Sequence, residues 1–314
     1  MKEQALRVVF EPEVESYDPN LYECKIVNCG ITGFEAVDEQ QIATYHENGF
    51  LLVKEAFSSI QVKSAKKELY NLTTSNQPSC ESIYYEGKIR NLISGIKQTT
   101  SDPTTNYKLE NLALGNTENQ LPLLEPSVRA KFVRKVMGFT RVENPALKHL
   151  ADCKDMLKVV SDLIRGNPKL YQDMALIKPP GGREKPWHQD RAYFNLTEKS
   201  KIVGVWIALD NARVENGCMQ VIENGHKKGP KLHFMRRDWQ ICDSEILEFR
   251  RLGIPMSPGD CLFFDALLPH GTPANQTDSQ RWAVQFHYVS QGSQDTNDEY
   301  RLEVFGSEGK DVSC

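Results

Sequence analysis

One short motif constrains this chain more than any other feature. His188 and Asp190 stand two residues apart, in a stretch that begins at Lys185 and runs Lys-Pro-Trp-His-Gln-Asp-Arg. On an extended strand, residues i and i+2 leave the same face, so this spacing brings an imidazole and a carboxylate together. Such a pair supplies two ligands of a metal site, and iron(II) oxygenases add a second histidine and keep three positions open. By itself the motif also fits a surface strand with two solvated polar residues.

A second stretch supplies the missing histidine. The turn sequence Pro258-Gly259-Asp260 precedes the apolar run 261–264, which is typical of a buried strand. His270 follows this run and can complete the set of ligands. Arg281 stands 11 residues later, at the start of an aromatic and β-branched run, so we expect two antiparallel strands with Arg281 facing the metal. A guanidinium there suits the far carboxylate of a dicarboxylate that chelates iron.

With these residues in place, the chain resembles the phytanoyl-CoA dioxygenase family of iron(II)- and 2-oxoglutarate-dependent oxygenases. The resemblance extends over roughly residues 38–290 and is most specific in the ordered set of His188, Asp190, His270 and Arg281. Three further stretches belong to it, namely Lys178-Pro179-Pro180, the run Gly-Val-Trp-Ile-Ala-Leu-Asp over 204–210, and Glu-Asn-Gly-Cys-Met over 215–219.

The resemblance implies the chemistry and most of the site. Iron(II) is expected on His188, Asp190 and His270, with 2-oxoglutarate and O2 as cosubstrates. Hydroxylation of an unactivated C–H bond of a small organic molecule, with release of succinate and CO2, is the expected reaction. The residues expected around 2-oxoglutarate are Arg281, Thr272, Lys135, Met174 and Trp206. Gln189 and His287 are expected next to the ligands or in the pocket.

Several alternatives stay open at this point. Lys135 also fits a solvated lysine on a helix, and Met174 and Trp206 also fit plain core positions. A jelly-roll iron enzyme that uses no 2-oxoglutarate would keep the three ligands but would not need Arg281. A catalytically silent binding protein on the same scaffold is the alternative from another class. Identity of the substrate, including whether it is a CoA ester, does not follow from the family.

The order of the expected elements predicts a mainly β fold with added helices. Helices are predicted at 38–48, 60–72, 127–137 and 152–164, the second with its apolar stripe on one face. From residue 171 onward, short strands and turns, with no further helical periodicity, favour a double-stranded β-helix (a jelly-roll or cupin-like core) flanked by N-terminal helices. The irregular stretch 73–125 is a candidate lid.

Domain limits and composition complete the prediction. We expect an N-terminal extension (1–35), one dioxygenase domain (36–300, helical over about 36–166 and jelly roll over about 170–290) and a C-terminal tail (301–314). Hydrophobic residues make up 39%, charged residues 25%, and the net charge is -4. These values favour a globular protein and give no sign of nucleic-acid or membrane binding. The N-terminus has no apolar signal core, so a cytoplasmic location is the expectation. Oligomeric state does not follow from the sequence.

Overall fold

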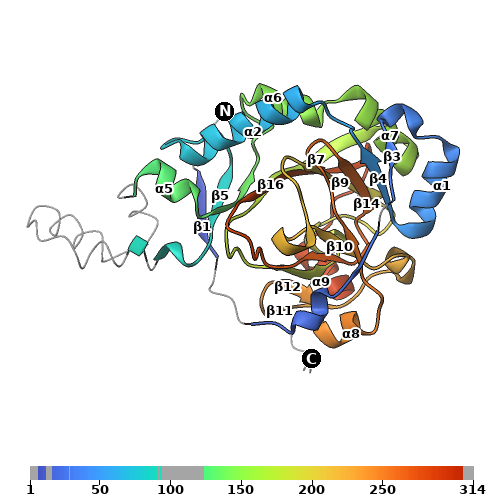
Figure 1. Cartoon of the computed structure of the whole chain (residues 1–314). Coiled ribbons are helices and arrows are strands. Elements are labelled where there is room, and N and C mark those ends of the chain that lie inside the picture. The colour runs from blue at the N-terminus through green and yellow to red at the C-terminus, as the bar shows by residue number, and fades with distance from the viewer. Residues whose placement is uncertain (1–5, 12–15, 28, 91, 94–123, 307–314) are drawn as a thin grey trace, which may run out of the picture.

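Two facing β-sheets form the centre of the computed structural model, which describes residues 6–11, 16–27, 29–90, 92–93 and 124–306 (Figure 1). The larger sheet has nine strands. In spatial order they are β1 (Arg7–Phe10), β5 (Ser82–Tyr85), β6 (Val133–Met137), β7 (Pro168–Lys178), β16 (Arg281–Ser290), β9 (Ile202–Ala208), β14 (Cys261–Asp265), β4 (Phe50–Lys54) and β3 (Ile31–Thr32).

The smaller sheet has five strands and carries the two histidines of the predicted triad. Its order is β2 (Lys25–Ile26), β13 (Leu252–Ile254), β10 (Met219–Val221), β15 (His270–Thr272) and β8 (Lys185–His188). A separate hairpin consists of β11 (His233–Met235) and β12 (Trp239–Ile241). The antiparallel strands β7, β16, β9 and β14 face β8, β15, β10 and β13, so the mainly β, cupin-like core is confirmed, as an open pair of sheets rather than a closed barrel.

Strand β9 shows why the sheets pack as they do. Its residues are all buried, because alternate side chains serve two different cores. Val203, Val205 and Ile207 pack under the helices. Trp206 and Ala208 point the other way, into the space between the sheets. Gly204 lies on this inner face against the ring of Phe264, and a Cβ there would come within 2.3 Å of that ring.

Helices cover the outer face of the larger sheet (Figure 1). They are α1 (Glu39–Asn48), α2 (Ser59–Thr74), α5 (Pro126–Ala130), α6 (Pro145–Ala151) and α7 (Lys154–Ile164). The first two begin as expected: Asp38 accepts hydrogen bonds from the backbone of Gln40 and Gln41, and Ser58 forms a capping box with Gln61. Gly49 ends α1 at φ 88°, a conformation that favours glycine.

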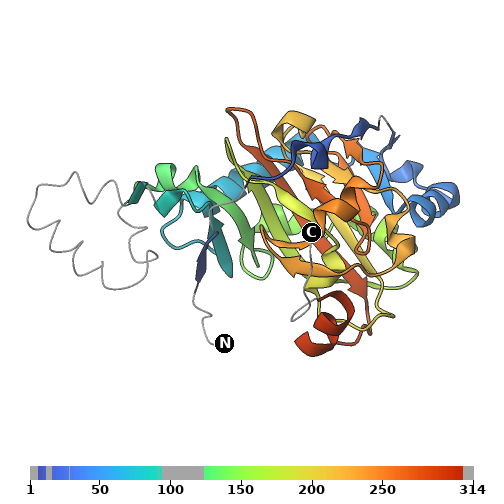
Figure 2. The same ribbon diagram turned by 90° about the horizontal axis from the view of Figure 1, so that it is seen from below.

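Three expectations about helices are wrong. Residues 127–137 form the short α5 and then strand β6, because Val133 and Val136 are β-branched and pair between β5 and β7. Asp152 ends α6 instead of beginning the next helix, which starts at Lys154. Beyond residue 171 two short helices are present, α8 (Asp243–Leu247) and α9 (Asp298–Phe305), and α9 lies at the end of the sheets (Figure 2).

Short 3-10 helices fill several connections: η1 (Pro19–Tyr22), η2 (Phe34–Ala36), η4 (Asp190–Tyr193), η5 (Val214–Asn216) and η6 (Gly225–Lys228). Most of the candidate lid, residue 91 and residues 94–123, lies outside the described residues. Among the described helices, none is long and apolar enough to cross a membrane.

Candidate metal and cosubstrate site

The predicted triad comes together at one end of the space between the sheets. His188 ends β8, and His270 opens β15 directly opposite it in the antiparallel pair. Asp190 follows as the first residue of η4, so the chain leaves the strand between the two ligands, and the expectation of a strand through Asp190 is wrong. The side chains still meet, and one ligand atom from each residue lies within 4.8 Å of the others.

Backbone carbonyls orient both imidazoles. His188 Nδ1 lies 2.7 Å from the oxygen of Pro186, and His270 Nδ1 lies 2.9 Å from the oxygen of Leu268. A carbonyl accepts only, so each Nδ1 carries the proton, and each Nε2 presents its lone pair. Both Nε2 atoms point toward Asp190 Oδ1, at 3.2 Å and 3.6 Å. Burial, together with the nearby His270, lowers the pKa of His188 to about 4, which keeps this ring neutral as a metal ligand requires.

The second oxygen of Asp190 is held from the opposite side. Oδ2 accepts a hydrogen bond from Gln285 Nε2 at 2.9 Å and lies 2.7 Å from His287 Nε2. Burial opposes ionisation, but the imidazoles of His270 and His287 hold the pKa of Asp190 well below its usual range. The carboxylate therefore stays charged, with Oδ1 free for a metal.

Arg281 lies in the same cavity, which has a volume of about 280 Å³. Its side chain is 2% exposed, and the guanidinium lies 5.2 Å from the Trp206 ring. Nε and Nη1 are buried and have no hydrogen-bond partner among the described residues. Burial lowers the pKa of Arg281 to about 10, so the group remains cationic at neutral pH. A buried cation with unpaired donors is costly unless an anion joins it.

Strand pairing around Arg281 differs from the expectation. Strands β15 and β16 belong to different sheets and do not pair with each other. Arg281 instead pairs with Lys178 of β7 and reaches the cavity across the space between the sheets. The reason is that the loop between His270 and Arg281 crosses from one sheet to the other, as the alternation of a jelly roll requires.

The other predicted residues divide into two groups. Thr272, Met174, Trp206 and Lys135 all line the cavity. Lys135 Nζ lies 4.0 Å from the centre of the Tyr84 ring, and burial, with Lys185 and Arg134 nearby, lowers its pKa to about 8. Gln189 points away and binds the backbone of Gly229 and Leu267, so it ties loops together outside the cavity.

Two residues were missed. Lys178 is buried beside Arg281, and its Nζ donates to Thr272 Oγ1 at 2.8 Å, which leaves the threonine proton free for another acceptor. Burial and Arg281 lower the pKa of Lys178 well below its usual range. Gln285 holds Asp190. The signals were present, because Lys178 opens a family stretch and Gln285 shares its strand face with Arg281 and His287.

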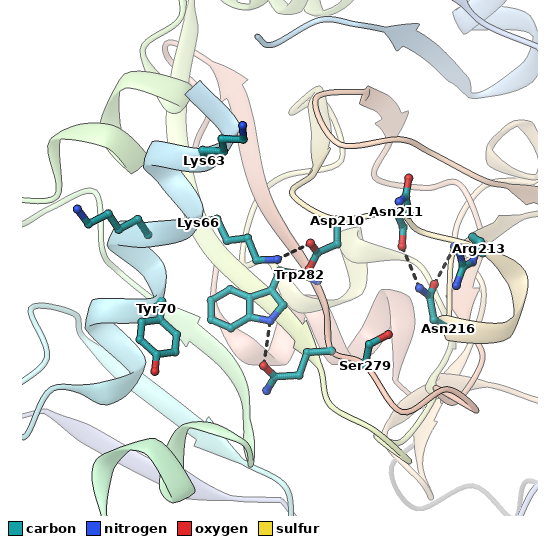
Figure 3. Close-up of a pocket in the computed structure, with 11 residues that line it drawn as sticks. Lys63, Lys66, Tyr70, Asp210, Asn211, Arg213, Asn216, Ser279 and Trp282 are labelled. Atoms are coloured by element: carbon teal, nitrogen blue, oxygen red, sulfur yellow. Dashed lines mark hydrogen bonds and ion pairs between the residues drawn. The ribbon is translucent and has the colours of Figure 1, made fainter. Parts of the chain in front are cut away.

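A larger hollow of about 750 Å³ lies between α2 and the loops that carry Asp210 and Ser279 (Figure 3). Lys66 and Asp210 form an ion pair across it. Trp282 lines this hollow, while the preceding Arg281 lines the metal cavity, because neighbouring residues of a strand point to opposite faces. None of the predicted metal or cosubstrate residues lines it, so the chemistry lies in the smaller cavity.

Comparisons with known proteins support this site. The model of the phytanoyl-CoA dioxygenase family matches residues 45–283. The chain belongs to this family. The resemblance inferred from the sequence is therefore confirmed.

Individual relatives are more distant. "Probable phytanoyl-CoA dioxygenase" of Caenorhabditis elegans is 31% identical over 177 residues, which cover 51% of this chain and 55% of that protein. "Phytanoyl-CoA dioxygenase, peroxisomal" of Homo sapiens is 26% identical over 264 residues, 80% of this chain and 68% of the relative. The chain therefore spans about half to two thirds of these two relatives.

Solved structures share the fold. A non-heme alpha ketoglutarate dependent carbocyclase from nogalamycin biosynthesis has a TM-score of 0.58 at 18% identity, covering 91% of this chain and 97% of the other. EctD from S. alaskensis, solved with 2-oxoglutarate and 5-hydroxyectoine, has a TM-score of 0.56 at 17% identity, covering 96% and 89%.

The residues of this chain fit an iron ion and 2-oxoglutarate. Two neutral imidazoles and one carboxylate present one donor atom each to a common point, which is the facial set of non-haem iron(II). The unpaired Nε and Nη1 of Arg281 fit the far carboxylate of a dicarboxylate in the same cavity.

Proposed function

We propose that this protein is an iron(II)- and 2-oxoglutarate-dependent dioxygenase that hydroxylates a C–H bond of a small molecule. Iron would be held by His188, Asp190 and His270. The far carboxylate of 2-oxoglutarate would bind Arg281 and the Thr272 hydroxyl. Lys135, Met174 and Trp206 would line its pocket. When bound, iron and 2-oxoglutarate supply the oxidising chemistry, in which R–H, O2 and 2-oxoglutarate give R–OH, succinate and CO2.

One observation carries the proposal. Arg281 is almost fully buried, yet Nε and Nη1 have no acceptor among the described residues, and they share a cavity with the triad. A metal enzyme that takes no keto acid has no need of this cation. A catalytically silent binding protein is disfavoured as well, because the three metal ligands and Arg281 are all present.

The chain's own side chains orient the reactants. Gln285 and His287 fix one oxygen of Asp190, so the other faces the metal position. The Trp206 ring covers Arg281 and keeps water from the guanidinium. Because position 190 is a carboxylate, the metal would have three protein ligands, which favours hydroxylation, desaturation or epoxidation over the halogenation that a small residue there permits in related enzymes.

Anaerobic titration tests the proposal. The protein is loaded with iron(II), then 2-oxoglutarate is added while the visible charge-transfer band of the chelate is followed. We expect a band in the wild type, none in His188→Ala, and roughly a ten- to hundredfold higher 2-oxoglutarate requirement in Arg281→Ala, because charge-assisted hydrogen bonds are lost. Arg213→Ala, an exposed arginine of the hollow in Figure 3, is the control. Iron binding without a band in the wild type would refute the 2-oxoglutarate assignment.

We further propose that residues 36–300 form the body of one catalytic domain, to whose sheets the preceding segment adds β1, β2 and β3, and that the chain works in the cytoplasm on a small-molecule substrate. Limited proteolysis and imaging of a tagged chain test these points. A stable fragment much shorter than 36–300, or a signal in peroxisomes such as the name of the human relative suggests, would contradict them.

A further inference from the structure

A residue outside the family match lines the metal cavity. Strand β1 adds to the edge of the larger sheet, parallel to β5, with Phe10 opposite Tyr85. The backbone of Glu11 continues the pairing, because its N–H donates to the oxygen of Tyr85 at 3.0 Å. This backbone bond fixes where the side chain leaves the strand, and the Glu11 carboxylate lines the same cavity as the triad. The family model begins only at residue 45.

The two oxygens of Glu11 have different surroundings. Oε2 binds Arg134 Nη1 at 2.8 Å and Arg183 Nη1 at 3.2 Å. Oε1 has no hydrogen bond among the described residues, although the side chain is only 14% exposed. The arginines thus hold the carboxylate in place, and one acceptor oxygen remains for a ligand in the cavity.

The rest of this wall is also polar and reaches the metal position. Lys185 Nζ forms an ion pair with Asp238 at 2.7 Å and donates to the Tyr193 hydroxyl at 2.8 Å. The Tyr193 ring in turn packs edge-on against the imidazole of His188, with centroids 5.6 Å apart. An apolar end group beside Glu11 would lie against these ion pairs and remove their water, which is unfavourable. A ligand with polar groups would replace that water.

We infer that Glu11 is a specificity-determining residue, and that the substrate is a small polar molecule that presents a hydroxyl or amine donor to Glu11 Oε1. This inference rests on the proposed function, since it assumes that the cavity binds the substrate beside the iron. It also gives the N-terminal segment a role, as part of the substrate wall.

Three matched probes test it by calorimetric titration of the anaerobic iron and 2-oxoglutarate complex. Hexanoate, 6-hydroxyhexanoate and 6-aminohexanoate share a chain and a carboxylate, and they differ in a terminal methyl, hydroxyl or ammonium group. The carboxylate suits the cavity, where lysine and arginine outnumber carboxylates. We expect the two donor probes to bind about tenfold more tightly than hexanoate, as one hydrogen bond to a charged acceptor requires. Equal binding of the three, or binding of none, would overturn the inference.

Variants locate the effect. Glu11→Leu removes the acceptor and should abolish the preference for the donor probes, whereas Glu11→Gln keeps an acceptor oxygen and should retain the preference for the hydroxyl. Glu23→Gln, an exposed glutamate of the same segment, is the control. If Glu11→Leu does not fold, titration of the three probes into the wild type and into Glu11→Gln still tests the inference. Failure of 2-oxoglutarate to bind at all would refute the proposed function, whereas normal 2-oxoglutarate binding with no donor preference would refute only the role of Glu11.

Discussion

At the scale of single residues, Asp190 uses its two oxygens differently. Oδ1 faces the two histidines, and Oδ2 is held by Gln285 and His287. Such outer hydrogen bonds fix the direction of a ligand and are commonly worth a ten- to hundredfold change in metal affinity.

We therefore expect His287→Phe to weaken iron(II) binding by about ten- to hundredfold, while the protein still folds. Anaerobic iron titration, with circular dichroism as a check of folding, measures this. His149→Asn is the matched control, because His149 is exposed on α6. Unchanged iron affinity in His287→Phe would show that Gln285 alone orients Asp190.

His233 gives a prediction for pH. Burial lowers its pKa to about 3, and its Nε2 accepts a hydrogen bond from the Gln189 backbone N–H, so the neutral ring is the folded form. The unfolded chain takes up a proton near the ordinary histidine pKa of about 6.5. Stability is therefore complete above pH 6.5 and falls as the pH drops toward 3.

Lowering the pH from 6 to 4 should therefore reduce the unfolding free energy of the metal-free protein by roughly 2 kcal/mol through His233. Urea unfolding at both pH values, in wild type and in His233→Phe, isolates its share. The variant should lose about that much less stability on acidification. The same pH dependence in both proteins would assign the loss to other groups.

At the scale of elements, the positions of the strands were easier to predict than which strands pair with each other. The runs 50–53, 202–209 and 281–288 are rich in apolar and aromatic residues and form β4, β9 and β16. Residues 127–137 have equally few local signals for helix and strand, and their place between β5 and β7 decides for a strand. The triad and Arg281 could be named from spacing. Glu11 needed the tertiary structure, because it acts through residues far away in the sequence.

The close contact of β9 with β14 can be tested at Gly204. A Cβ there would come within 2.3 Å of the Phe264 ring, so Gly204→Ala must displace a packed aromatic side chain. We expect a loss of about 1–3 kcal/mol in unfolding free energy, measured by urea denaturation. Gly166→Ala, where the nearest contact is the Ser290 hydroxyl at 3.2 Å, should cost less. Equal effects would show that the ring moves aside freely.

At the scale of the whole molecule, the N-terminal segment is built into the catalytic core. Strand β1 pairs with β5 at one edge of the larger sheet, η1 contacts α8, and β3 pairs with β4 at the other edge (Figure 1). Tyr22 of η1 donates to Glu184, and the fully buried Glu184 carboxylate also pairs with Arg237, which binds Asp243 of α8. This network joins the segment to the start of β8 and to α8, and the sequence neighbours Lys185 and Asp238 line the metal cavity.

Removing Arg237 should therefore affect more than one element. Arg237→Ala leaves the Glu184 carboxylate buried without its cation, so we expect a loss of about 3–5 kcal/mol. Hydrogen exchange should become faster in η1 and α8 together. The exposed Arg250 provides the control Arg250→Ala. Faster exchange in α8 alone would mean that the N-terminal segment is held independently of this network.

We propose that one cavity holds iron and 2-oxoglutarate between the triad and Arg281. Anomalous X-ray diffraction at the iron edge, from crystals grown anaerobically with iron(II) and 2-oxoglutarate, tests it most directly. We expect one iron peak bound by His188 Nε2, Asp190 Oδ1 and His270 Nε2, with the 2-oxoglutarate carboxylate on Arg281. An iron peak elsewhere, or 2-oxoglutarate bound away from Arg281, would contradict it.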